Sequence, residues 1–167
     1  MCIRDRNIPI RIGVNAGSLE KGLLDKCGGD LPKAMVESAK RHVEILNRFD
    51  FDNIVLSMKS SNVAATVRAY RLASQTFDYP LHLGVTEAGT IKQGIVKSSV
   101  GIGSLLVDGI GDTIRVSLTD DPILEVSAAK SILRALDLDE DYIEVVSCPT
   151  CARTKIDLIS IANAVND

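Results

Sequence analysis

The stretch Ile10-Arg-Ile-Gly-Val-Asn15 alternates apolar with polar residues, which is typical of a β-strand that buries one face. Five further short runs are rich in β-branched residues or leucine and are bounded by turn residues, as strands are. The predicted strands cover residues 10–14, 53–58, 81–86, 102–107, 114–118 and 143–147.

Helix-start signals lie between most of these strands. Each signal is a side chain that can accept a hydrogen bond from the first helical turn. The predicted helices begin at Asp30, Asn62, Thr90 and Asp121. Because strands alternate with helices, the sequence predicts an α/β fold with a mostly parallel sheet. The segment 108–112 is too short for a helix, so the runs before and after it form either a tight barrel crossover or a hairpin.

Composition narrows the class of protein. With 46% hydrophobic and 25% charged residues among 167, the chain is expected to be soluble and to bury a sizeable core. A net charge of −3 argues against a general nucleic-acid binder. No run approaches the roughly 18 apolar residues of a membrane span. Residues 1–6 lack the apolar region of a secretory signal, so we expect a cytoplasmic protein.

Polar residues lie at the carboxyl ends of the predicted strands, where parallel α/β proteins have their active sites. These positions hold Asn15, Lys59, Glu87, Asp108, Ser117 and Cys148. The two-residue period of a strand puts Arg11 on the face of Asn15 and Arg115 on the face of Ser117. The sequence therefore predicts three cations, Arg11, Lys59 and Arg115, at one mouth.

Buried cations need anionic partners. Arginine offers a planar fork for phosphate oxygens and lysine a point charge, so a phosphorylated ligand is one interpretation. The alternative is internal pairing with Glu87 or Asp108. Glu87 is also a candidate general acid or base, whereas His82 is interpreted as a core histidine.

The segment Cys148-Pro-Thr-Cys151 supplies two thiolates that can occupy two corners of a tetrahedral metal or iron–sulfur site. Residues 152–167 contain no further Cys or His. The pair therefore acts alone as a dithiol, or the remaining ligands lie outside this chain. Cys2 and Cys27 are interpreted as ordinary thiols.

Six segments, in this order, resemble the IspG or GcpE family of 4-hydroxy-3-methylbut-2-enyl diphosphate synthases, from the methylerythritol phosphate route to isoprenoids. The resemblance covers about residues 8 to 167. The segments are Arg11-Ile-Gly-Val-Asn-Ala-Gly-Ser18, Leu56-Ser-Met-Lys-Ser-Ser-Asn62, His82-Leu-Gly-Val-Thr-Glu-Ala-Gly89, Gly101-Ile-Gly-Ser-Leu-Leu106, Asp108-Gly-Ile-Gly-Asp-Thr-Ile-Arg-Val-Ser117 and Ser147-Cys-Pro-Thr-Cys151.

For the fold, the resemblance implies a TIM (β/α) barrel followed by a C-terminal domain that holds a [4Fe-4S] cluster. We expect residues 8–141 to be the C-terminal part of the barrel and residues 142–167 the start of the cluster domain. Residues 1–7 do not resemble the family. Five barrel strands are predicted where a full barrel has eight. The chain is thus expected to be an inactive internal fragment, with open sheet edges that promote association.

For the activity, the resemblance implies reductive ring opening and dehydration of 2-C-methyl-D-erythritol 2,4-cyclodiphosphate to (E)-4-hydroxy-3-methylbut-2-enyl diphosphate. It implies ferredoxin or flavodoxin as electron donor, a homodimer at full length, and neither a nucleic-acid nor a membrane partner. Glu87 would protonate the departing hydroxyl, and Cys148 and Cys151 would be two cluster ligands. The residues expected to grip the diphosphate are Arg11, Asn15, Lys59, Arg115 and Ser117.

Two other functions remain open. A strand followed by Cys-x-x-Cys at a helix start is also the arrangement of thioredoxin-like dithiol proteins. That function leaves the three cations unexplained. A non-catalytic, phosphate-binding half-barrel of the pteroate-synthase kind would bind an anion and leave the cysteines idle.

Overall fold

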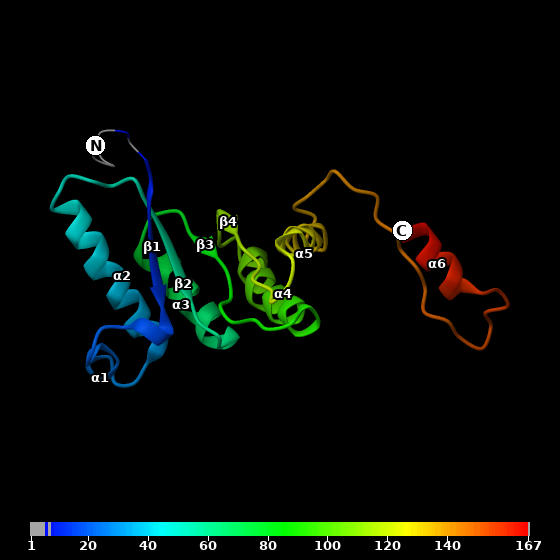
Figure 1. Cartoon of the computed structure of the whole chain (residues 1–167), viewed down its shortest axis with the longest axis horizontal. Helices are drawn as coiled ribbons and strands as arrows, with labels where there is room; N and C mark the ends of the chain where they lie inside the picture. Colours follow the sequence, from blue (N-terminus) through cyan, green and yellow to red (C-terminus); the bar gives the residue numbers. More distant parts are fainter. Residues whose placement is uncertain (1–5, 7, 167) are drawn as a thin grey trace.

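Within residues 6 and 8–166, which the computed structural model describes, four strands alternate with helices (Figure 1). The predicted segment 1–7 lies outside the described residues, apart from residue 6, and so does Cys2. The strands are β1 (Ile10–Asn15), β2 (Ile54–Lys59), β3 (His82–Leu83) and β4 (Thr113–Ile114).

The strands lie side by side in the order in which they occur along the chain. β1 pairs in parallel with β2, with Asn15 opposite Lys59. β3 pairs in parallel with β4, with His82 opposite Thr113. A single parallel bridge, Leu56 with Leu81, connects the two pairs. This is the sequential parallel order of (β/α) barrels, and the described strands do not close into one.

A helix follows each strand. These helices are α2 (Leu31–Asn47), α3 (Val63–Thr76), α4 (Ile91–Val107) and α5 (Pro122–Arg134). The predicted starts at Asp30, Asn62 and Asp121 are confirmed, because each side chain accepts a backbone N–H of the first turn. Shorter elements are η2 (Ala16–Ser18), α1 (Leu23–Lys26) and, near the C-terminus, α6 (Leu158–Asn166). Within the described part of the chain, no helix is long and apolar enough to cross a membrane.

The predicted strand at 102–107 is wrong, because these residues form the end of α4. A short apolar run cannot distinguish a strand from a buried helix. Here Gly101 brings the helix close to the segment that follows β3: a Cβ at this position would meet Val85 Cγ2. The segment 108–112 therefore joins a helix to β4, and β3, α4 and β4 form one parallel βαβ unit rather than a hairpin.

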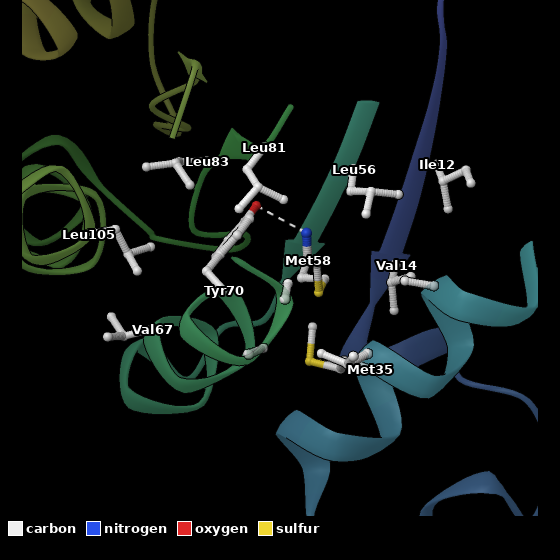
Figure 2. Packing of buried hydrophobic residues seen from close by; sticks show 14 of the residues in the cluster. Ile12, Val14, Met35, Leu56, Met58, Val67, Tyr70, Leu81, Leu83 and Leu105 are labelled. Atoms are coloured by element: carbon white, nitrogen blue, oxygen red, sulfur yellow. Dashed lines mark hydrogen bonds between the residues drawn. The ribbon is translucent and has the colours of Figure 1, made fainter. Parts of the chain in front are cut away.

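The core lies between the sheet and the helices. Ile12, Val14, Leu56 and Met58 alternate along β1 and β2 and are buried, and Met35 of α2 packs against this face (Figure 2). The alternation predicted for β1 is confirmed, since Arg11, Gly13 and Asn15 are exposed on the opposite face. The inner face of the curved sheet is thus left to polar side chains.

Tyr70 of α3 connects the two halves of the sheet. Its hydroxyl accepts a hydrogen bond from the Met58 backbone N–H at 3.0 Å (Figure 2). The same hydroxyl donates a hydrogen bond to the His82 carbonyl. Burial raises the pKa of this phenol above its usual value. Since only the Leu56–Leu81 bridge joins β2 to β3, the hydroxyl supplies hydrogen bonds that a regular ladder would otherwise make.

The C-terminal segment departs from the prediction. Residues 143–147 form no strand, and the Ile143 and Val146 side chains are 91% and 82% exposed. A strand needs a neighbouring backbone, and none lies beside this segment in the described part of the chain. Figure 1 shows the segment running away from the α/β part toward α6.

We predict that Tyr70→Phe lowers the free energy of unfolding by about 1–3 kcal/mol, because it leaves two buried backbone groups without a partner. Urea unfolding followed by far-UV circular dichroism measures the loss. Tyr79→Phe is the control, because that hydroxyl makes only a 3.5 Å exposed contact with Asn47. Equal stability of the two variants would contradict the bridging role.

Candidate anion-binding site

Two rows of residues cross the inner face of the sheet near the carboxyl ends of its strands. The upper row consists of Asn15, Lys59, Gly84 and Arg115. Asn15 and Lys59 are partners in the β1–β2 register. Gly84 and Arg115 come directly after the paired residues Leu83 and Ile114.

Lys59 lies directly over Gly84. A Cβ at Gly84 would be 2.9 Å from the Arg115 carbonyl oxygen, which is too short for a real side chain, and 3.1 Å from the Lys59 Nζ atom, which is tight. The glycine therefore leaves room for the lysine amine to lie beside the backbone of the neighbouring strand. The upper row therefore brings Lys59 to Arg115.

The lower row lies two residues nearer the strand starts and consists of Gly13, Ser57, His82 and Thr113. Gly13 pairs with Ser57 and His82 with Thr113. His82 Nδ1 lies 2.8 Å from Thr113 Oγ1. Ser57 and His82 are buried. A polar layer thus lies beneath the cations.

Arg11 begins deeper than the sequence suggested. It is opposite Val55, four residues before Asn15, or about 13 Å along the strand. Its charge nevertheless contributes to the lowered pKa of both Lys59 and His82. The structure brings Arg11 to the cluster from below rather than at the strand end.

The cluster carries uncompensated positive charge. Burial, followed by the charges of Arg115 and Arg11, lowers the pKa of Lys59. No carboxylate of the described residues lies within 4.0 Å of Lys59 or Arg11. Asp108, one of the two predicted internal partners, instead pairs with Arg71 at 2.7 Å.

Glu125 is an acidic neighbour that sequence reasoning missed. Its Oε2 atom lies 3.9 Å from Arg115 Nε, and its Oε1 atom accepts the Leu118 backbone N–H at 2.9 Å. The sequence did contain a signal for this position, namely the predicted start of a helix at Asp121. Asp121 and Pro122 start α5, which puts Glu125 in the first turn, above the end of β4. Arg115 is 59% exposed, so this long pair leaves its fork open to a ligand.

Asn15 is the last residue of β1, whereas β4 ends at Ile114, so the strand predicted to continue to residue 118 is wrong there and Ser117 lies beyond it. The Asn15 Oδ1 atom accepts the Gly17 backbone N–H at 3.0 Å and so caps η2, which leaves its amide nitrogen for other contacts. Ser117 is half-buried on the segment between β4 and α5.

Glu87 is an exposed residue on the loop between β3 and α4. Its φ of 52° is in the left-handed region. β3 ends at Leu83, so the two-residue period of a strand does not govern the direction of residue 87. Within the described chain, the Glu87 carboxylate pairs with none of the cations.

His82 is buried with its ring among these cations. It is 8% exposed, and its Nε2 atom is buried without a hydrogen-bond partner. Burial, aided by the charges of Lys59, Arg11 and Arg115, lowers the pKa of His82 to about 4. The ring is therefore neutral at neutral pH.

Cys148 and Cys151 are exposed free thiols far along the chain from the cations. Hydrogen bonds from the Arg153 backbone and from Thr154 lower the pKa of Cys151, which favours the thiolate form that metals bind. The described residues contain no group of three or more potential metal ligands. α6 begins only at Leu158, so the cysteines do not start a helix as they do in thioredoxin-like proteins. Cys27 is a half-buried free thiol.

Three synthases illustrate the similarity to known proteins. The Fusobacterium nucleatum 4-hydroxy-3-methylbut-2-en-1-yl diphosphate synthase (flavodoxin) is 58% identical over 164 residues, covering 98% of this chain and 46% of that protein. Proteins of the same name from Caldanaerobacter subterraneus and Clostridium tetani are 60% and 62% identical over 162 residues, covering 97% of this chain and 46% of each. The chain thus spans less than half the length of these curated relatives.

A family comparison covers most of the chain. The family described as the GcpE TIM-barrel domain matches residues 1–130. The strand order and the strand-end cations lie within that range. By this match and by its relatives, the chain belongs to the GcpE family.

Proposed function

We propose that this chain is the barrel part of a 4-hydroxy-3-methylbut-2-enyl diphosphate synthase, with residues 8–141 in the barrel and 142–167 opening the cluster domain. The reaction would be reductive ring opening of 2-C-methyl-D-erythritol 2,4-cyclodiphosphate. It consumes two electrons and two protons and releases one water. The observation that carries the proposal is the set of three converging cations, of which only Arg115 has an acidic neighbour among the described residues.

The cations would bind the diphosphate. Lys59 has a lowered pKa, and an anion placed beside it relieves both the repulsion from Arg115 and Arg11 and the cost of its burial. Arg115 and Arg11 would hold phosphate oxygens with their planar forks. The Asn15 amide and the Ser117 hydroxyl would complete the grip. Positive charge fixed at this position stabilises the phosphate as it leaves the ring carbon.

Glu87 would be the acid that protonates the departing hydroxyl. Glu87 is exposed on the segment that follows β3, four residues after the strand ends. A carboxyl close to bound substrate and shielded from water can hold a proton at neutral pH. Its loop would bring it to the substrate when the ligand binds.

Cys148 and Cys151 fit an iron–sulfur cluster as two of its ligands, since both thiols are exposed, close in sequence and, for Cys151, biased toward thiolate. When bound, a [4Fe-4S] cluster supplies the two electrons singly. The relatives' printed name includes flavodoxin, which supports flavodoxin as the donor. The protein would act as a homodimer at full length.

The alternatives have less support. A thioredoxin-like dithiol needs its cysteines at a helix start, and α6 begins seven residues after Cys151. A non-catalytic phosphate-binding half-barrel of the pteroate-synthase kind explains the cations and leaves the cysteine pair without a role.

A chimera tests the function. We predict that this chain, put in place of the 162 matching residues of the Clostridium tetani synthase, gives a brown protein that converts the cyclic diphosphate with reduced flavodoxin. Anaerobic iron–sulfide reconstitution, visible absorbance and product analysis measure this. Cys148→Ser should lose iron and colour. A folded, brown and inactive chimera would exclude the proposed substrate.

In the same chimera, Glu87→Gln should lower kcat by about 100-fold or more with little change in KM, because a proton donor acts in the transition state. Steady-state kinetics measure both constants. Glu44→Gln, on the exposed face of α2, is the matched control. Turnover near that of the parent would remove Glu87 from the acid role.

The positive site also predicts a pH dependence of stability. The His82 pKa is about 4 in the folded chain, against about 6.5 when unfolded. Between these values only the unfolded chain binds the proton, so stability falls as pH drops from about 6.5 to about 4. The slope from His82 approaches ~1.4 kcal/mol per pH unit. Urea unfolding across this range should show a shallower slope for His82→Gln, and equal slopes would show that the ring is not kept neutral.

A further inference from the structure

We infer that His82 is a further ligand-binding residue, whose Nε2–H donates a hydrogen bond to a phosphate oxygen of the anion held by Lys59 and Arg115. The inference deepens the proposed function and rests on it. It assigns a binding role to a residue that the sequence suggested was part of the core.

The strand geometry places the ring beneath the cations. His82 and Gly84 are two residues apart on β3 and its continuation, so both face the inner side of the sheet. The Lys59 amine lies over Gly84. Leu83, between them, points to the helix side, where it contacts the backbone at Gly111. The imidazole is therefore the group directly below Lys59.

The ring has one satisfied nitrogen and one unsatisfied nitrogen. Nδ1 lies 2.8 Å from Thr113 Oγ1, and Nε2 has no partner although it is buried. Buried polar atoms are nearly always paired, so an orphan at a cluster of cations calls for a partner. Lysine and arginine side chains contain no acceptor. An acceptor for an Nε2–H group must therefore come with the ligand, and phosphate oxygens are acceptors.

The inference uses one of the two neutral tautomers. When the Thr113 hydroxyl donates to Nδ1, the proton of the neutral ring is on Nε2, the nitrogen that has no partner. The opposite tautomer would turn a lone pair toward Lys59, and no hydrogen bond joins the two side chains among the described residues.

Burial, followed by the charged groups around the ring, lowers the pKa of His82 and keeps the ring neutral. These groups are Lys59 on β2, Arg11 on β1 and Arg115 after β4, and the Tyr70 hydroxyl on α3 binds the His82 carbonyl. A neutral donor adds a hydrogen bond to the anion without adding a fourth positive charge to a cluster that already repels itself.

Two substitutions separate a ligand-binding role from a structural one. An asparagine amide reaches the position of Nδ1 and keeps the Thr113 contact, whereas a glutamine amide reaches the position of Nε2. We predict that His82→Asn binds inorganic pyrophosphate at least tenfold more weakly than the parent 167-residue chain, and that His82→Gln binds within threefold of it. Isothermal titration calorimetry measures the affinities, and circular dichroism checks that each variant is folded.

The reverse order, with Asn retaining affinity and Gln losing it, would show that His82 acts through Thr113 and would overturn the inference. Equal losses in both variants would also overturn it, since the ring would then matter for packing alone. Lys59→Ala should abolish binding and Lys40→Ala, on the surface of α2, should not. If Lys59→Ala abolishes binding while both His82 variants bind like the parent, only this inference fails. If the parent does not bind pyrophosphate, the diphosphate site of the proposed function fails with it.

Discussion

The Tyr70 hydroxyl is the contact on which the arrangement of the site depends. β2 and β3 share one backbone bridge, and without a further connection the two strand pairs could shift relative to each other. The hydroxyl ties the Met58 N–H to the His82 carbonyl. Met58 directly precedes Lys59, and His82 is itself a residue of the site. A buried phenol on α3 thus sets how the Lys59 amine meets Gly84.

The site stores electrostatic repulsion in its free form. Three cations converge, Lys59 is half-buried, and the one acidic neighbour among the described residues is the distant Glu125 carboxylate. Such an arrangement costs stability, and the rest of the fold offsets that cost. The gain comes on binding, because an anion replaces like-charge repulsion with attraction in a partly desolvated place. The same charge explains why a histidine here is neutral. A proton on His82 would be a fourth positive charge.

Most of the site was predictable from the sequence because it depends on short-range rules. The alternation along β1 placed Arg11 and Asn15 on one face, and helix caps at Asp30, Asn62 and Asp121 bounded the strands between them. The strand at 102–107 was mispredicted, since a short apolar run interrupted by Gly103 has no period of its own to separate strand from helix. Gly101 packs against Val85, a contact that suits a helix at this position. The two residues are distant in the sequence, so this contact could not be predicted from local pattern. The hydrogen bonds of Tyr70 and the orphaned His82 nitrogen are likewise tertiary, so no spacing rule reveals them.

Residues 143–147, which precede the cysteine pair, show the same limit of local sequence rules. Residues 143–147 have the β-branched composition of a strand, yet a strand exists only where a second backbone receives its hydrogen bonds. Ile143 and Val146 are almost fully exposed, which is costly for such side chains and unusual for a finished surface. Among the described residues no second backbone pairs with this segment, so its strand-like composition does not produce a strand. Cys148 and Cys151 follow this irregular segment, whereas the cations are placed by the sheet that carries them.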